Sequence, residues 1–214
     1  ILMAQAAGGQ ISAANRGLLL LTPGFAKELE SYVPGWLMMV NREGRRFVDE
    51  SIEYSVMAAV LGEQEDRIAF GIFDEASRMA SKTTSYRPAP NWTADRLDEF
   101  VAAGTLEKAD SIAGLAERIG ISPDVLHTTV NRYNDHVSDK ADGGFFKPAS
   151  FLRPITSPPF YAARICAAII CWTGTGLRID TRAQVLDAAD RPIPGLYAAG
   201  ETTGGMFGEC YASG

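Results

Sequence analysis

The sequence predicts an α+β fold, and two kinds of local pattern carry that prediction. Apolar runs of strand length occupy residues 36–40, 67–73 and 161–170. Two helical patterns, at residues 110–120 and 122–133, lie between the second and third of these runs, and each begins with a helix-start signal. With 214 residues, 46% of them hydrophobic and 21% charged, the chain can bury a core in one domain or in two small ones.

The N-terminal third is predicted to contain helices and strands in alternation with turns. Residues 1–8 form a helix that the pair Gly8-Gly9 stops, and a strand region follows. The run 36–40 leads into the turn sequence Asn41-Arg-Glu-Gly44 and then Arg46-Phe-Val48, which predicts a hairpin with short arms and a positive φ at Gly44. A helix is expected at residues 51–61, a strand at 67–73 and a loop at 81–92.

Two capped helices are the clearest local predictions. Asp110-Ser111 precedes the first helix, which ends at Gly120. Its apolar positions recur at helical spacing: Ile112, Leu115, Ala116 and Ile119. Ser122 is expected to cap the second helix, with Pro123 at its first position, where a missing N–H costs nothing. The stripe expected to be buried on that helix is Leu126, Val130 and Tyr133.

The C-terminal quarter is predicted to consist of strands and glycine turns. A strand at 161–170 is followed by the turn Thr173-Gly-Thr-Gly176, a strand-turn-strand at 177–194 and a short strand at 196–199. The chain then enters the glycine-rich sequence Gly200-Glu-Thr-Thr-Gly-Gly205. Such a sequence is either a tight turn or a loop whose main-chain N–H groups approach a ligand closely.

Composition excludes several classes of function. A net charge of −6, with no basic block longer than Arg45-Arg46, disfavours a nucleic-acid partner. The longest apolar stretches, 17–21 and 162–172, fall short of the roughly 20 residues that a membrane-spanning helix needs. Cys166, Cys171 and Cys210 are odd in number and form no Cys-x-x-Cys pair, so we expect no disulfide framework, no metal site and a cytoplasmic location.

The order of the C-terminal motifs resembles one group of flavoproteins. The turn at 173–176, the strands after it and the loop at 192–205 are similar to the C-terminal flavin region of the fumarate reductase and succinate dehydrogenase flavoprotein family, which includes the 3-ketosteroid dehydrogenases. Residues 41–50 resemble the hairpin that enters this family's cap domain, and 110–134 its pair of cap helices. The resemblance implies FAD as cofactor and an α+β cap inserted into an α/β FAD-binding domain, with the substrate between cap and flavin.

The same resemblance implies a division of the chain. Residues 1–16 would be the end of the N-terminal FAD-binding segment, 17–172 the substrate-capping domain and 173–214 a truncated C-terminal FAD-binding segment. No Gly-x-Gly-x-x-Gly is present, so the α/β FAD-binding domain would be incomplete, without its pyrophosphate-binding turn. We therefore expect the chain to be a fragment of a longer polypeptide, to bind FAD weakly by itself and to be inactive without the rest.

Candidate site residues follow from the resemblance. The sequence Asp49-Glu50-Ser-Ile-Glu-Tyr54 resembles the Asn-Glu-Ser-x-x-Tyr stretch of 3-ketosteroid dehydrogenases, and Tyr211-Ala-Ser213-Gly214 resembles their C-terminal tyrosine loop. Tyr54 and Tyr211 are thus the catalytic candidates: one phenol would hydrogen-bond a ketone oxygen, and the other would remove a proton as phenolate. Two other interpretations are equally good: Tyr54 as a buried helix residue, and Tyr211 as an aromatic side chain that packs on the flavin. The implied FAD-binding residues are Gly200, Glu201, Thr202, Gly204, Gly205, Ser213 and Gly214, and the implied substrate pocket is Trp172, Met206 and Phe207.

The substrate class depends on which cations are missing. Fumarate reductases clamp two carboxylates with arginine and histidine, but the corresponding positions here hold Tyr54, Trp172 and Tyr211, and no histidine lies near Leu20. Those replacements favour a hydrophobic, steroid-like ketone. The Gly200-Glu201 pair followed by Gly204-Gly205 is closer to fumarate reductases and tricarballylate dehydrogenases, so an enzyme acting on carboxylates stays open, as does a non-catalytic binding module with the cap fold. Arg45, Arg46, Arg178, His127 and His136 are expected to be solvated.

Overall fold

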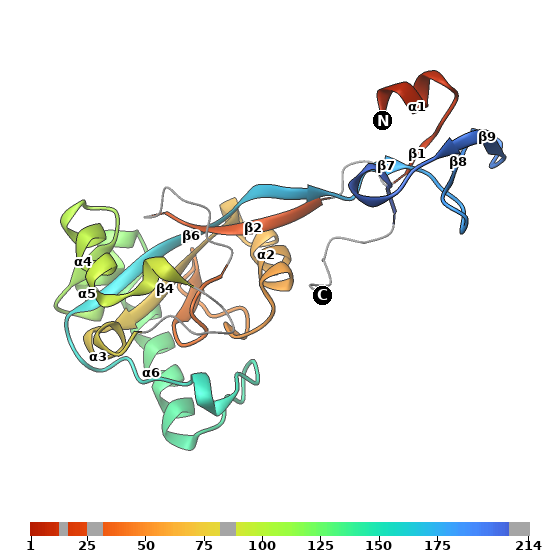
Figure 1. Ribbon diagram of the computed structural model, residues 1–214. Coiled ribbons are helices and arrows are strands. Elements are labelled where there is room, and N and C mark those ends of the chain that lie inside the picture. Colours follow the sequence, from red (N-terminus) through yellow and green to blue (C-terminus); the bar gives the residue numbers. More distant parts are fainter. Residues whose placement is uncertain (13–16, 25–31, 82–88, 206–214) are drawn as a thin grey trace. The chain divides into compact units, whose positions relative to one another are not determined.

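The computed structural model describes residues 1–12, 17–24, 32–81 and 89–205 (Figure 1). The chain divides into two compact units. The larger unit comprises Leu21–Ala168, and the smaller unit comprises Ile1–Leu20 with Ile169–Gly214. Among the described helices, none is both long and apolar enough to cross a lipid bilayer.

A five-stranded sheet is the scaffold of the larger unit. Its strands run in the order β2-β6-β4-β3, and β5 pairs with β6 outside this path. Residue Ile72 of β4 stands opposite Met38 of β3 and Ala162 of β6, both in antiparallel pairing. The strands are β2 (Gly17–Pro23), β3 (Met38–Asn41), β4 (Ile68–Asp74), β5 (Glu107–Ala109) and β6 (Phe160–Thr173). The predicted strands at 67–73 and 161–170 are therefore confirmed.

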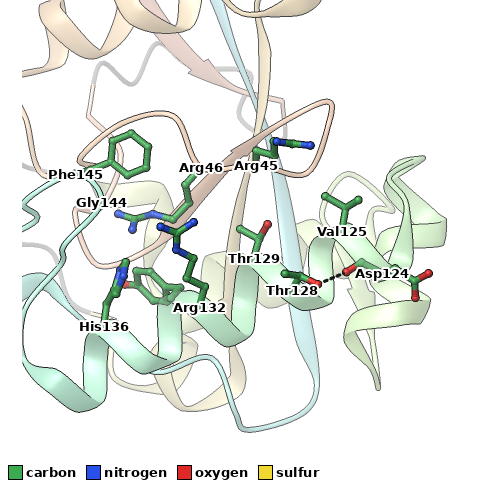
Figure 2. Close-up of a pocket in the computed structure, with 11 residues that line it drawn as sticks. Arg45, Arg46, Asp124, Val125, Thr128, Thr129, Arg132, His136, Gly144 and Phe145 are labelled. Carbon is green, nitrogen blue, oxygen red and sulfur yellow. Dashed lines mark hydrogen bonds between the residues drawn. The ribbon is translucent and has the colours of Figure 1, made fainter.

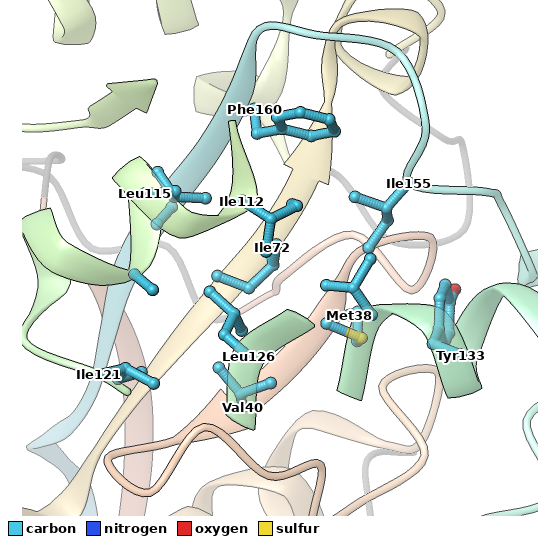
Figure 3. Close-up of a cluster of buried hydrophobic side chains, with 13 residues drawn as sticks. Met38, Val40, Ile72, Ile112, Leu115, Ile121, Leu126, Tyr133, Ile155 and Phe160 are labelled. Carbon is cyan, nitrogen blue, oxygen red and sulfur yellow. The ribbon is translucent and has the colours of Figure 1, made fainter. Parts of the chain in front are cut away.

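Helices α5 (Ile112–Ile119) and α6 (Pro123–Asp139) pack on this sheet and close a hydrophobic core with it (Figure 3). The predicted stripe of Leu126, Val130 and Tyr133 is at most 2% exposed. It lies against side chains from β3, β4 and β6, including Met38, Val40, Ile72 and Phe160. The periodicity of the sequence thus identified the buried face of α6 because that face is apolar at each helical repeat.

The ends of these helices follow the predicted chemistry with one exception. The Ser111 hydroxyl accepts a hydrogen bond of 3.1 Å from the Gly114 N–H, and Gly120 ends α5 with φ +72°. At the start of α6, Ser122 is the N-cap residue, as predicted, but its side chain makes no capping hydrogen bond. Pro123 occupies the first helical position as expected and needs no donor partner there.

The region around residues 41–48 differs from the predicted hairpin. The turn is present, with the Asn41 side chain accepting hydrogen bonds from the N–H groups of Glu43 and Arg45, and Gly44 has φ +79°. Residues 46–48 form no strand, however, and β3 pairs with β4 instead. In this segment the Arg46 side chain makes buried ion pairs, described below.

Helices α2 (Tyr54–Gly62), α3 (Glu75–Met79) and α4 (Ala94–Ala102) complete the larger unit. The helix expected at 51–61 is therefore confirmed, beginning at Tyr54. We did not predict α3 or α4, each of which has at most nine residues.

The smaller unit is built from short elements. Helix α1 (Leu2–Ala6) is followed by β1 (Ile11–Ser12), which pairs antiparallel with β7 (Gly176–Leu177). Strand β8 (Gln184–Leu186) pairs antiparallel with β9 (Pro192–Tyr197). A small core of Ala4, Leu177, Val185 and Ala198 holds these elements together. With the larger unit, they confirm the mixed helix and sheet class that the sequence predicts.

Candidate functional site

The predicted FAD loop lies in the smaller unit, directly after β9. Residues Gly200–Thr202 form a single 3-10 turn in which Gly200 has φ +72°. Apart from its chain neighbours, no atom of the described residues lies within 4 Å of the position that a Cβ on Gly200 would occupy, and Glu201 and Thr202 are exposed. The chain therefore offers open main chain here, which fits the close approach of a ligand.

Behind this turn, two glycine segments pack against each other. The Gly204 N–H donates to the Leu177 carbonyl at 3.0 Å, and the Gly205 N–H donates to the Gly174 carbonyl at 3.2 Å. A Cβ on Gly204 would lie 2.4 Å from the Gly176 nitrogen, and a Cβ on Gly176 would lie 2.4 Å from the Thr203 carbonyl carbon. Both positions require glycine because the facing main chain leaves no room for a side chain. The structure thus brings the predicted loop and the turn at 173–176 together.

Tyr54 lies in the larger unit, as the first residue of α2. The preceding residue, Glu53, caps this helix by accepting a hydrogen bond of 2.6 Å from the Ser55 N–H. The half-buried Tyr54 ring meets the Tyr32 ring edge to face, with the centroids 5.1 Å apart. A cavity of only about 10 Å³ lies beside them, lined by Leu21, Tyr32, Val33, Glu50, Ile52, Tyr54 and Met57. Sequence reasoning missed Tyr32, which no motif marks.

Glu50 connects this cavity to a buried group of charges. Its side chain is fully buried and accepts three hydrogen bonds of 2.9 Å, one from the Met39 N–H and two from the Arg46 guanidinium. The Lys147 ammonium lies 3.1 Å from Glu50 Oε2 and donates to the Leu37 carbonyl at 2.8 Å. Arg46 also donates to Asp142 at 2.9 Å. Arg46, Glu50, Asp142 and Lys147 thus form a buried charge cluster of two cations and two carboxylates.

The environment within the cluster shifts the pKa values of Arg46, Asp142 and Lys147. Burial lowers the pKa of Arg46, but the hydrogen bonds and charges of Glu50 and Asp142 outweigh it and raise that pKa. Burial raises the pKa of Asp142, yet the Arg46 guanidinium more than offsets it and holds the pKa well below its usual range. For Lys147 burial dominates and lowers the pKa despite Glu50. Burial and the charge of Glu50 both raise the pKa of Tyr133, whose hydroxyl lies 3.2 Å from the Lys147 ammonium.

The side chains of Arg46 and His136, which were expected to be solvated, are therefore largely buried. Arg46 is 6% exposed in this cluster, with its guanidinium 5.0 Å from the Tyr133 ring centroid and 5.1 Å from that of Phe145. His136 is 17% exposed, and its Nδ1 lies 2.9 Å from Asp142 Oδ1. Arg45 and His127 are exposed, as predicted. The sequence could not reveal the difference between Arg45 and Arg46 because their carboxylate partners were not identifiable.

Several predicted site residues lie outside what the structure describes. Trp172 belongs to strand β6, and its side chain is not among the described ones. Met206, Phe207, Tyr211, Ser213 and Gly214 all lie beyond residue 205, where the described part of the chain ends.

Comparisons with known proteins identify the relatives of the chain. It is 35% identical over 171 residues to "Fumarate reductase (cytochrome)" of Shewanella frigidimarina, covering 80% of this chain and 27% of that protein. It is 29% identical over 217 residues to "3-oxosteroid 1-dehydrogenase" of Mycolicibacterium smegmatis, covering 90% of this chain and 37% of that protein. The crystal structure of 3-ketosteroid delta1-dehydrogenase from Sterolibacterium denitrificans superposes with a TM-score of 0.78 at 26% identity, covering 99% of this chain and 42% of that one.

These relatives confirm the family resemblance that the sequence motifs indicate. The chain spans between about a quarter and two fifths of the length of these relatives. The family model for "FAD binding domain" matches residues 6–214, almost the whole chain. FAD is accordingly the cofactor of the family. By this match, the chain belongs to the FAD binding domain family shared by fumarate reductases and 3-ketosteroid dehydrogenases.

Proposed function

We propose that this chain is part of an FAD-dependent oxidoreductase that dehydrogenates or reduces a C–C bond next to a carbonyl group, with a hydrophobic, 3-ketosteroid-like ketone as substrate. In this proposal, residues 17–172 are the substrate cap, and the flanking segments 1–16 and 173–214 belong to the FAD-binding domain. The relatives named fumarate reductase and 3-oxosteroid 1-dehydrogenase support the type of reaction.

The observation that carries the substrate class is the environment of Tyr54. Where a dicarboxylate reductase is expected to place a cation, this chain places a phenol in contact with a second phenol, Tyr32. The buried guanidinium of Arg46 donates to Glu50 and Asp142, so two carboxylates of the chain itself already balance its charge. An aromatic surface suits an apolar ketone better than a dicarboxylate.

The proposed roles divide between the two units. FAD, when bound, supplies the hydride acceptor or donor. Of Tyr54 and Tyr211, one phenol donates a hydrogen bond to the ketone oxygen, and the other takes or returns the proton on the neighbouring carbon. Main chain and side chains of the loop hold the flavin, with Trp172, Met206 and Phe207 lining the substrate pocket. The loop residues in this role are Gly200, Glu201, Thr202, Gly204, Gly205, Ser213 and Gly214.

A carboxylate substrate is the second candidate. It is favoured by the higher identity to "Fumarate reductase (cytochrome)", 35% against 29% for "3-oxosteroid 1-dehydrogenase". It is opposed by Tyr54 and Tyr211, which occupy two positions where a clamp for the substrate carboxylates needs cations. A non-catalytic binding module with this fold is the third candidate, and it predicts no electron transfer to the flavin by any substrate.

Anaerobic stopped-flow reduction of the complete FAD-loaded protein by a 3-ketosteroid tests the proposal. Tyr54→Phe and Tyr211→Phe should leave the flavin content unchanged and slow flavin reduction about 10²–10⁴-fold, as expected for the loss of an acid–base group. Tyr197→Phe is the matched control, since Tyr197 is 62% exposed on β9. Reduction at the wild-type rate in both variants, or rapid reoxidation of the reduced flavin by fumarate, would transfer the assignment to a carboxylate substrate.

A further inference from the structure

The larger unit contains a second, much larger cavity that the proposed reaction does not use. It has a volume of about 660 Å³ and is formed by the turn after β3, helix α6 and the loop that follows α6 (Figure 2). Its lining residues are Arg45, Arg46, Asp124, Val125, Thr128, Thr129, Arg132, Tyr133, His136, Gly144 and Phe145. This volume lies within the range of small-molecule sites, about 300–1,000 Å³.

Positive charge dominates the lining. Three arginines, Arg45, Arg46 and Arg132, line the cavity against a single carboxylate, Asp124. The charge of Arg46 is already balanced within the buried charge cluster. Arg132 is exposed, and within the described part of the chain no carboxylate oxygen lies within 4.0 Å of its guanidinium. The cavity therefore has an arginine whose donors are available to a ligand.

The placement of Arg132 favours an anion further. In Figure 2 its guanidinium is directed toward that of Arg46, with Gly144 and Phe145 beside them. Because Glu50 and Asp142 already balance the charge of Arg46, the charge of Arg132 is the one left for an anion bound at this place. Arg45 also lines the cavity, and its only described ion pair is a loose one with Glu43, at 3.7 Å and largely exposed to water.

The two threonine hydroxyls of the lining already donate their protons within the chain. The Thr128 hydroxyl donates to the Asp124 carbonyl at 2.8 Å, and the Thr129 hydroxyl donates to the Gly44 carbonyl at 2.7 Å. Their protons are therefore committed to the main chain. Recognition of an anion in this cavity would depend on the guanidinium groups, which are suited to bidentate contact with carboxylates and phosphates.

An aromatic side chain lies next to these cations. The loop after α6 is fixed by Asp142, whose side chain accepts hydrogen bonds from the N–H groups of Gly144 at 3.0 Å and Phe145 at 3.3 Å. The half-buried Phe145 ring is thus held at the cavity wall. The next residue, Phe146, has φ +61° and is 83% exposed, and a non-glycine residue in this region is held there at an energetic cost. Of these two rings, that of Phe145 lines the cavity, so the loop presents one aromatic ring beside the arginines.

We propose that this cavity binds a small organic anion, a carboxylate or phosphate monoester attached to an apolar body, with Arg132 at the anionic group and Phe145 against the body. The proposal does not depend on the substrate of the flavin reaction, because all the residues that carry it lie in the larger unit and none is a proposed catalytic residue.

Isothermal titration calorimetry of the complete FAD-loaded protein tests the inference. Benzoate and phenyl phosphate are the two organic anions, inorganic phosphate lacks the apolar body, and benzyl alcohol lacks the charge. The variant is Arg132→Gln, and the matched control is Arg118→Gln, which removes an exposed arginine of α5 paired only loosely with Glu107 at 3.8 Å. A second variant, Phe145→Ala, tests the contact with the apolar body.

We expect saturable binding of at least one organic anion, weakened at higher salt because the contacts are charged. Arg132→Gln should weaken it about 10-fold or more, the loss of a charge-assisted hydrogen bond, while Arg118→Gln should change it less than about twofold. Phe145→Ala should weaken phenyl phosphate more than inorganic phosphate. The inference is overturned if neither organic anion binds saturably, if benzyl alcohol binds as well as benzoate, or if Arg132→Gln leaves the dissociation constant unchanged.

Discussion

Replacing Arg46 by methionine should strongly destabilise the larger unit, whereas the same change at the adjacent Arg45 should not. Arg46 is 6% exposed and makes three side-chain hydrogen bonds of 2.9 Å to Glu50 and Asp142. Arg45 is 72% exposed, and its ion pair with Glu43 spans 3.7 Å. The two variants remove the same charge one residue apart, so their difference isolates the effect of burial.

The magnitude follows from what the substitution leaves behind. Removing one partner of a buried ion pair costs about 3–5 kcal/mol, because the remaining charge stays desolvated and uncompensated. Glu50 keeps the Lys147 ammonium at 3.1 Å, whereas Asp142 loses its guanidinium partner and keeps the main-chain N–H groups of Gly144 and Phe145. We therefore expect Arg46→Met to lower the free energy of unfolding by about 3 kcal/mol, the lower end of that range, and Arg45→Met by about 0.5 kcal/mol or less.

A double variant sharpens this prediction. Asp142→Asn keeps a side-chain oxygen for the N–H groups of Gly144 and Phe145 but removes the charge that Arg46 balances. Combined with Arg46→Met, it leaves the Glu50–Lys147 pair balanced. The double variant should therefore be more stable than the sum of the two single losses, by about 1 kcal/mol or more.

Urea denaturation followed by the fluorescence of the buried Trp36 and Trp92, together with far-UV circular dichroism, measures these free energies. The reasoning is refuted if Arg46→Met and Arg45→Met unfold within about 0.5 kcal/mol of each other, or if the double variant shows simple additivity.

Two further predictions concern other parts of the chain. Hydrogen bonds from Arg78, opposed by burial and assisted by the Tyr161 hydroxyl, lower the pKa of Glu75 from 4.5 to about 2. Because the folded-state pKa is the lower one, this stabilisation is complete above about pH 4.5 and is lost as the pH falls toward about 2, so Glu75→Gln should flatten the pH dependence of urea denaturation in that window. Gly204→Ala would place a Cβ 2.4 Å from the Gly176 nitrogen and should lower the thermal stability of the smaller unit by about 1–3 kcal/mol. Gly143→Ala, where a Cβ meets no atom within 4 Å in the part of the chain that the structure describes, should be nearly neutral, and equal melting of the two variants would contradict the packing argument.

Local patterns in the sequence determined the elements whose chemistry is contained in adjacent residues. The cap at Ser111, the stop at Gly120, the stripe on α6 and the positive φ of Gly44 were all predictable, because helix periodicity, capping and turn geometry act over a few residues. The flavoprotein family was identifiable from the order and spacing of several motifs along the chain, and the family model confirms it. The helix that Tyr54 begins was predictable in the same way.

Tertiary structure alone decided which charges are buried and which segments meet. Arg45 and Arg46 are equivalent in the sequence, and the carboxylate that separates them, Asp142, lies 96 residues from Arg46. The pairing of β3 with β4, the contact of Gly176 with Gly204 and the cavity around Arg132 likewise join residues far apart in the chain. Such contacts depend on the packing of the whole unit, and no local periodicity of the sequence encodes that packing. The physical rules that determine a helix cap act within a few residues, so they do not determine which distant segments pack against the helix.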